Sequence, residues 1–311
     1  MKKLTLLLLC FLCAGAASAQ EKYYFPATKG AELTYKYYNQ RGKALKDQWK
    51  KERWMKFVVE DVWPQDNGMV INVGVGNEVI ERLAGSKSLA AVAENMAYGD
   101  VKIEGDSVTL DNMQWVADVV PEMFSYISSG REEGPTFGVT LTALSSFPRN
   151  MQVGDVLPDE NILDAKYEEI VSEEVQAERQ ARMKEMEAEF MAMAPGFGRM
   201  GSMPTSFSIS AKAQTRNRKV EAMETVQTPA GSFECYKITY ELVIPNSGFG
   251  LGMRMIHVGP DGMMMGDDRE PEPEGIKYAD WISPEVGLVK REKYNNRGKL
   301  QEMMRLESYK K

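Results

Sequence analysis

Apolar and polar residues alternate in short segments along most of the chain, and residues that favour turns separate these segments. The first segment, 32–37, reads Glu-Leu-Thr-Tyr-Lys-Tyr, so Leu33, Tyr35 and Tyr37 would share one face of a strand. Parallel strands need a crossover of a dozen or more residues, whereas a short turn can join antiparallel strands. The short spacing of the segments therefore predicts a mainly β chain built from antiparallel hairpins.

Gly, Asn and Pro mark the predicted turns, because Gly and Asn tolerate positive φ and Pro ends a strand. The turns and their flanking segments are Arg41-Gly42 between 32–37 and 45–59, Asn67-Gly68 between 57–62 and 69–75, Gly105-Asp106 between 101–103 and 108–110, Pro229-Ala230-Gly231 between 220–226 and 233–244, and Arg297-Gly298 between 287–294 and 300–309.

One short repeat occurs near both ends of the chain. Tyr38-Asn39-Gln40-Arg41-Gly42-Lys43 matches Tyr294-Asn295-Asn296-Arg297-Gly298-Lys299 at five of six positions. Shared turn chemistry can explain the match, since Asn and Gly favour tight turns. A pseudo-symmetric fold with two related terminal hairpins is the alternative.

Two segments depart from the strand pattern. The segment 168–193 is rich in strong helix formers and has a narrow apolar stripe, so it predicts a helical insertion. A shorter helix is expected within 111–127, although Pro121 would divide it. Gly-rich and acidic Pro-rich pieces indicate a flexible loop over 246–275. We expect all of these to be excursions from a single β domain over 20–311.

The first 19 residues have the parts of a secretory signal: Lys2-Lys3, an apolar run over 4–12, and the small residues Ala17-Ser18-Ala19. The apolar run is shorter than the roughly 20 residues that a transmembrane helix needs. We therefore expect cleavage near Ala19 and a soluble exported protein, periplasmic or extracellular, without a transmembrane anchor. A lipoprotein is the alternative, but Cys10 and Cys13 follow leucines instead of the small residue that lipid attachment requires.

Cleavage would change the charge and the cysteine count. Loss of Lys2-Lys3 takes the formal net charge from −7 to −9, and of the three cysteines only Cys235 would remain. The acidic balance argues against a nucleic-acid partner, which would need a basic face. Cys235 shares a predicted strand face with Phe233, so we expect a buried structural thiol.

Five motifs, each weak by itself, follow one another along residues 24–309. They are Tyr24-Phe25-Pro26 with Lys29-Gly30 and Tyr35, Val153-Gly154-Asp155-Val156-Leu157-Pro158-Asp159, Asn217-Arg218-Lys219-Val220-Glu221, Thr228-Pro229-Ala230-Gly231-Ser232-Phe233-Glu234-Cys235-Tyr236-Lys237-Ile238, and Val286-Gly287-Leu288-Val289-Lys290. In series they resemble a family of exported bacterial proteins of unknown function, labelled TapB-like. The resemblance implies a strongly curved antiparallel sheet, similar to the open half-barrels of periplasmic lipoprotein carriers, and it implies no catalytic residues. With the segments above, the expected fold is this open half-barrel with one or two helical insertions.

Catalytic signatures are missing from the sequence. It contains no G-x-S-x-G elbow, no phosphate-binding Gly-Lys-Ser/Thr loop and no H-E-x-x-H pair. A Ser-His-Asp triad would need His257, the only histidine. We therefore expect a protein without catalytic residues or cofactors, and a hydrolase with an unrecognised site is an alternative.

Methionine is unusually frequent, with 21 residues, and many of them fall in the windows 183–203 and 253–265. Thioether sulfur is a soft ligand that suits Cu(I). The candidate metal ligands are Met253, Met255, His257, Met263, Met264 and Met265. A Met-rich Cu(I)-handling protein is therefore a second hypothesis. Flexible filling of irregular contacts and a sacrificial oxidant sink are the other interpretations of these residues.

Aromatic residues crowd the first part of the predicted mature chain, and a curved sheet needs large residues on its concave face. They are Tyr23, Tyr24, Phe25, Tyr35, Tyr37, Tyr38, Trp49, Trp54 and Trp63. If they fill that face they form a core, and if they fill it incompletely they leave a groove for a hydrophobic ligand or a protein partner. The preferred hypothesis is an exported, non-catalytic binding or scaffold protein of unknown ligand.

Overall fold

The computed structural model describes most of the β-rich parts of the chain. The described ranges are 23–46, 50–86, 97–111, 137–142, 144–169, 208–243 and 275–311, with single residues or pairs inside 90–94, 173–188 and 258–263. The predicted signal segment at 1–19 lies outside these ranges, as does the predicted helix at 111–127 apart from Asp111.

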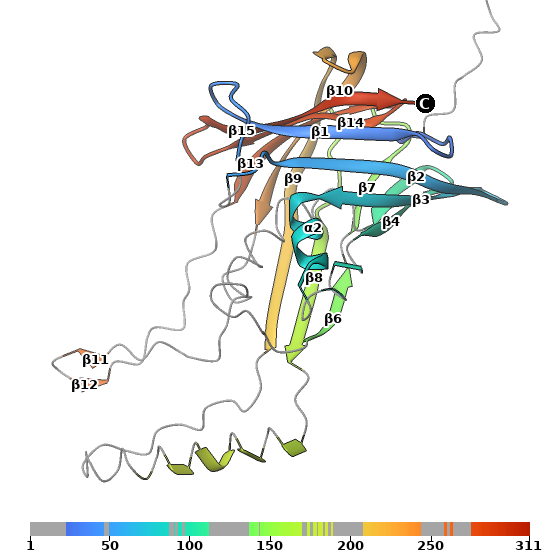
Figure 1. Cartoon of the computed structure of the whole chain (residues 1–311). Coiled ribbons are helices and arrows are strands. Elements are labelled where there is room, and N and C mark those ends of the chain that lie inside the picture. Colours follow the sequence, from blue (N-terminus) through green and yellow to red (C-terminus); the bar gives the residue numbers. More distant parts are fainter. Residues whose placement is uncertain are drawn as a thin grey trace, which may run out of the picture.

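Thirteen strands form one curved sheet (Figure 1). They are β1 (Glu32–Asn39), β2 (Trp54–Gln65), β3 (Gly68–Asn77), β4 (Tyr98–Glu104), β5 (Ser107–Asp111), β6 (Phe137–Thr142), β7 (Leu144–Pro148), β8 (Glu160–Glu169), β9 (Ser208–Thr228), β10 (Gly231–Val243), β13 (Ile276–Ser283), β14 (Gly287–Tyr294) and β15 (Leu300–Lys310). Every neighbouring pair is antiparallel, in the order β6-β8-β9-β10-β13-β14-β15-β1-β2-β3-β4-β5-β7.

The mainly β, curved antiparallel fold predicted from the sequence is confirmed. The curvature brings the sheet almost to closure as a barrel, because β7 at one end of the strand order lies against β8 near the other end. In Figure 1, β8 and β9 accordingly run steeply across the direction of β1, β2 and β3. This near closure brings together residues that are far apart in the sequence.

The five predicted hairpins are present. Burial alternates along β1, where Leu33, Tyr35 and Tyr37 face the interior. One turn is displaced from its predicted position: Gln65 pairs with Gly68, so Asp66 and Asn67 form the β2–β3 turn. Gly68 belongs to β3, where an added Cβ would lie 1.6 Å from the Ile103 carbonyl oxygen, so its lack of a side chain permits close approach of β4.

The helical segments differ in part from expectation. The predicted helix at 168–193 begins too early, because β8 continues to Glu169, where it pairs with Phe137. The described residues between 173 and 188 are helical and exposed. Within the predicted loop at 246–275, the described residues form a two-stranded ladder of β11 (Val258–Gly259) and β12 (Gly262–Met263). A short helix that the sequence patterns missed, α2 (Glu78–Ala84), follows β3 directly.

Side chains fill the concave side of the described sheet. Most of the aromatic residues assigned to this face form the core, as predicted for a filled face, together with aliphatic residues of β2, β3, β4 and α2. The largest fully buried side chains are Tyr24, Tyr35, Tyr37, Phe57, Leu33, Met55, Ile71, Leu83 and Ile103. The others depart from this pattern: Tyr23 and Trp54 are half-buried, Trp63 is 48% exposed near the end of β2, and Trp49 lies outside the described residues.

Candidate binding site at the closing seam of the sheet

A β-bulge in β9 turns one charged side chain towards the interior. Arg216 pairs with Glu241 and Lys219 pairs with Thr239, so two residues of β9 oppose the single residue Tyr240. The first of the two, Asn217, has φ +56°, a left-handed conformation that Asn tolerates better than most residues. Such a bulge re-aims side chains, and here Arg218 rather than Asn217 is buried.

Arg218 joins three strands at the place where the sheet nearly closes. Its guanidinium forms an ion pair of 2.8 Å with Glu160 at the start of β8 and donates hydrogen bonds to the carbonyls of Pro158 and Ser146. Glu160 accepts the Ser146 amide hydrogen at 3.1 Å and the Ser146 hydroxyl hydrogen as well. A buried charge requires a partner with good geometry, and Arg218 has one although its side chain is only 5% exposed. We call Ser146, Glu160 and Arg218 the seam cluster.

Two cavities adjoin the seam cluster, and Thr215 lines both of them. The outer pocket, of about 240 Å³, is polar, with Asp159, Asn161 and Arg216 among its lining residues. The inner cavity, of about 20 Å³, also contacts Arg218. The Thr215 hydroxyl is buried and forms no hydrogen bond with described residues. A cavity of that size with polar walls can hold about one water molecule, which would satisfy this hydroxyl.

A second buried ion pair adjoins the inner cavity, which its carboxylate partner Asp280 helps to line. Arg291 contacts both carboxylate oxygens of Asp280 at 2.8 Å, and the Tyr240 hydroxyl donates to the same carboxylate at 3.2 Å. Tyr240 in turn stacks on Tyr278, with ring centroids 5.5 Å apart. Bidentate pairing of this kind fixes the two side chains in one geometry. The buried charged groups beside the inner cavity are therefore paired with one another.

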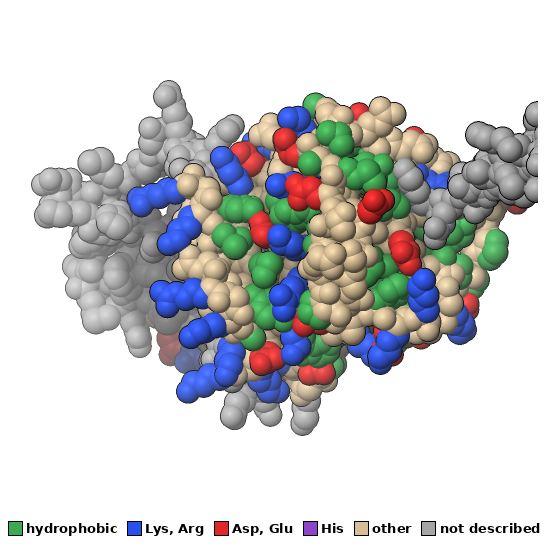
Figure 2. All heavy atoms as spheres, turned by 90° about the horizontal axis from the view of Figure 1, so that it is seen from above, with side chains coloured by type: hydrophobic (Ala, Val, Ile, Leu, Met, Phe, Trp, Pro, Cys, Tyr) green, Lys and Arg blue, Asp and Glu red, His purple; other side chains and the backbone are tan. Residues whose placement is uncertain are grey.

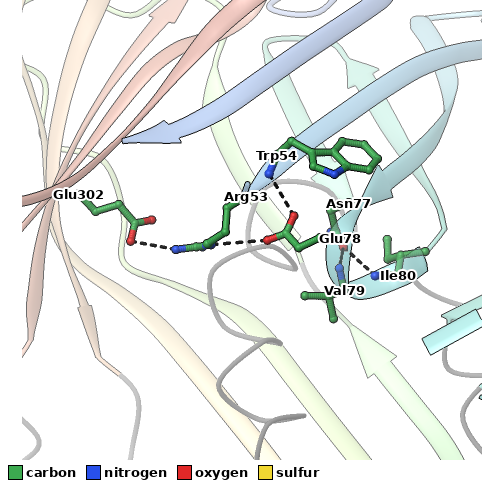
Figure 3. A network of polar contacts seen from close by, with 7 residues as sticks. All are labelled: Arg53, Trp54, Asn77, Glu78, Val79, Ile80 and Glu302. Carbon is green, nitrogen blue, oxygen red and sulfur yellow. Dashed lines mark hydrogen bonds and ion pairs between the residues drawn. The ribbon is translucent and has the colours of Figure 1, made fainter. Parts of the chain in front are cut away.

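A third polar network anchors α2 to the sheet (Figure 3). Arg53 forms ion pairs with Glu302 of β15 at 2.9 Å and with Glu78 of α2 at 3.5 Å. Glu78 also accepts the Trp54 amide hydrogen at 3.1 Å. The Asn77 side chain caps the helix by accepting the amide hydrogens of its second and third residues at 2.9 and 2.8 Å.

The motifs that suggested the family resemblance contact one another in the structure. The segment 153–159 runs along the bulged part of β9: Leu157 donates its amide hydrogen to the Arg218 carbonyl, Gly154 to Val220, and Asp159 accepts from the Asn217 amide. Likewise, the Tyr35 hydroxyl of the first motif donates to the Leu288 carbonyl of the last motif at 2.8 Å. These motifs therefore hold the fold together.

The metal-ligand candidates are not brought together by the described structure. Met253, Met255, His257, Met264 and Met265 lie outside the described residues, and Met263 is described only as a backbone position of β12. Among the described residues, no group of three or more His, Cys, Asp or Glu side chains could hold a metal ion. The Cu(I) hypothesis therefore stays a prediction.

Cys235 and the seam cluster hold nucleophilic groups, and both are constrained by their surroundings. Cys235 is buried as predicted, and burial together with the nearby Glu224 raises the pKa of its thiol to about 12. A thiol of this kind is a poor nucleophile near neutral pH. Ser146 donates to a carboxylate, but Arg218 already holds that carboxylate, so the arrangement serves as a structural anchor.

Across the described ranges, no helix is long and apolar enough to span a membrane.

Sequence patterns did not predict the seam cluster. Alternation through Ala213 and Thr215 would place Asn217 inside the sheet, and only the bulge moves Arg218 to that side. The Asn217-Arg218 pair belongs to one of the five motifs, and an Asn before a charged residue within a strand is the available signal for a bulge. Ser146 and Glu160 carried no signal that distinguished them from other polar residues.

Among the comparisons with known proteins, one family model matches part of the chain. The DUF3108-like family matches residues 199–256, and the described part of that match, 208–243, is the β9–β10 hairpin with the bulge. No curated protein sequence matches the chain. The match is to the DUF3108-like family, and the TapB-like label is not confirmed.

Three solved structures are similar over nearly the whole chain. One, described as a lipoprotein from Parabacteroides distasonis, has 17% identity and a TM-score of 0.49 and covers 93% of this chain and 99% of its own. Another, described as an exported protein with a YmcC-like fold from Bacteroides fragilis, has 16% identity and a TM-score of 0.46, with 92% and 98% covered. The lipoprotein YmcC of Escherichia coli has 6% identity and a TM-score of 0.26, with 96% and 93% covered.

Proposed function

We propose that the chain is an exported binding or scaffold protein without catalytic activity, and that its partners contact the outside of a filled β frame. The signal-like first 19 residues support export to the periplasm or beyond. The observation that carries the outside location of these partners is the state of the interior. Its large aromatic side chains are buried and its charges are paired, so the described interior serves as a core.

A hydrophobic ligand on the concave face is the weaker form of this proposal. The inner cavity has a volume of about 20 Å³, whereas pockets that enclose small molecules usually have about 300 Å³ or more. The outer pocket at the seam is larger but polar, with carboxylate, amide and guanidinium groups in its lining. The described walls therefore favour a partner outside the frame over a lipid inside it.

Crosslinking in intact cells, followed by purification, tests the binding role. Val156 is 79% exposed, so a photoreactive residue there reports contacts without disturbing the core. We expect one reproducible adduct that is lost when unlabelled chain is supplied in excess. Only background adducts, at this position and at the exposed Met223, would contradict the binding role.

Turnover assays on the purified chain test the absence of catalysis. The substrates are model esters, phosphoesters, glycosides and peptides, and the paired variants are Ser146→Ala and Glu160→Gln. We expect no turnover above the uncatalysed rate for any of the three chains. Hydrolysis by the natural chain that both substitutions abolish would show that the seam cluster is an active site.

A further inference from the structure

Two turns with the same sequence and geometry lie at one end of the sheet. In each, the Asn side-chain oxygen accepts the amide hydrogens two and four residues later, at 2.8 and 3.1 Å for Asn39 and at 3.0 and 2.9 Å for Asn295. The glycines of both turns, Gly42 and Gly298, have φ +71°. Turn chemistry thus accounts for the Asn and the Gly of the Tyr-Asn-x-Arg-Gly-Lys repeat, but it does not require the Arg and Lys.

The two turns are neighbours in space although about 250 residues separate them. Strand β1 pairs with β15 up to Asn39 and Glu302, and β14 pairs with β15 up to Tyr294 and Leu300. Both turns therefore extend from the same end of three adjacent strands, at the left of Figure 1. Between β1 and β2 the chain continues this end with bridges from Tyr38 to Ala44 and from Lys46 to Glu52.

Cations collect on this end of the molecule. Lys and Arg side chains line the left edge in Figure 2. The two turns and the β1–β2 connection contribute exposed cations, and six of them form what we call the basic edge: Arg41, Lys43, Lys46, Lys50, Arg297 and Lys299. None of the six forms an ion pair with a described residue. The nearby carboxylates are engaged elsewhere, Glu52 by Lys36 at 3.2 Å and Glu302 by Arg53 at 2.9 Å.

The rest of the molecule restricts what the basic edge can bind. Outside the basic edge, the described residues include 23 Lys and Arg and 31 Asp and Glu, so the rest of the described surface is net acidic. A flexible polyanion that wraps around the protein would meet this acidic surface. A flat anionic surface would contact mainly the edge, and the carboxylates at the opposite end of the strands would lie beyond the Debye length of about 8–10 Å at physiological salt.

The geometry points to the basic edge as a docking surface for the anionic headgroups of a phospholipid bilayer. This inference rests on the proposed binding role and names one partner for it. Four of the six cations, at positions 41, 43, 297 and 299, lie in short hydrogen-bonded turns, so their backbone positions are set before contact. Each Lys or Arg brought near an anionic bilayer strengthens the attraction, and salt screens it. The membrane would contact the tips of the turns, with no insertion of the frame.

Vesicle flotation with two matched double variants tests this inference. Lys43→Gln with Lys299→Gln removes two cations from the edge, and Lys29→Gln with Lys310→Gln removes two from the opposite end of β1. The natural chain should bind vesicles of phosphatidylcholine mixed with phosphatidylglycerol and should not bind phosphatidylcholine alone. The edge variant should bind at least about tenfold more weakly, since each cation contributes roughly fivefold, and the control variant should keep most of the binding.

Three results would overturn the inference. They are failure of the natural chain to bind anionic vesicles at low salt, equal losses in the two variants, and tight edge-dependent binding to soluble polyglutamate that vesicles do not compete with. Salt-sensitive self-association that the edge variant abolishes would likewise assign the edge to a second copy of the chain. Each of these results leaves the crosslinking test of the binding role unaffected. Unchanged thermal unfolding of the edge variant confirms that the turns still fold.

Discussion

Gly287 lies where β14 begins, and the backbone of Tyr24 passes directly over it. Its φ is +77°, and a Cβ at this position would lie 2.4 Å from the Tyr24 carbonyl oxygen. Gly298 has a similar φ of +71°, but a Cβ there would meet nothing within 4 Å. Substitutions at the two glycines therefore distinguish backbone strain, present at both, from steric overlap with a second segment, present only at Gly287.

Gly287→Ala should destabilise the protein by about 2–4 kcal/mol, since strain and overlap with backbone atoms add. Gly298→Ala should cost about 1 kcal/mol, the strain alone. Urea unfolding of both variants measures the difference. Equal losses would show that the Tyr24 segment does not press on Gly287 in solution.

Three buried groups with raised pKa values determine how we expect the stability of the protein to depend on pH. Burial raises the pKa of the Cys235 thiol to about 12 and also raises the pKa values of the Tyr24 and Tyr35 hydroxyls. In the unfolded chain these groups titrate near pH 8.5 for Cys and near pH 10 for Tyr. Above those values the unfolded chain binds fewer protons than the native protein, so stability falls as pH rises.

The free energy of unfolding should therefore decline steadily between about pH 9 and about pH 11. Denaturant titrations at several pH values measure this slope. Tyr35→Phe and Cys235→Ala should each flatten it, although both variants start from lower stability. A slope that neither substitution changes would contradict the burial of these groups.

At the scale of elements, sequence patterns predicted the hairpins well and the closure poorly. Alternation along β1 and turn residues such as Gly105-Asp106 act locally, so a single sequence reveals them. The seam depends on contacts between β7, β8 and β9, and on a bulge that alternation hides. The helix α2 is only seven residues long, and its cap follows a strand without a break, so no period was visible.

The seam cluster should stabilise the near closure of the sheet. Glu160→Gln leaves the buried Arg218 without its charge partner and should cost about 2 kcal/mol or more. Asp164→Asn, also in β8, breaks a solvent-exposed pair with Lys212 and should cost less than about 1 kcal/mol. Hydrogen exchange should also quicken in β7 for the first variant only. Unchanged exchange in β7 would mean that other contacts hold the seam.

The cap of α2 provides a second test at this scale. Asn77→Ala removes the acceptor for two amide hydrogens and should cost about 1 kcal/mol. Asn77→Ser keeps an acceptor and removes a buried amide nitrogen that has no hydrogen-bond partner among the described residues, so it should be nearly neutral. Thermal unfolding distinguishes the two. A larger loss for Ser than for Ala would contradict the capping geometry.

At the scale of the whole molecule, the fold combines a filled interior with an uneven surface charge. The aromatic residues that the sequence placed on a concave face are mostly core, so this part of the architecture could be predicted. The proximity of the two repeated turns could not be predicted, because it depends on β1 and β15 becoming neighbours in the sheet. The described part of the molecule is thus a filled β frame, and its ends and edges are the surfaces that we propose for partners.

Native mass spectrometry of the protein purified from its own compartment tests the filled interior most directly. We expect the mass of the bare chain, with bound lipid at most loosely attached and lost at low collision energy. A hydrophobic molecule retained in stoichiometric amount, and released only when the protein unfolds, would disprove the filled interior and restore the concave face as the binding site.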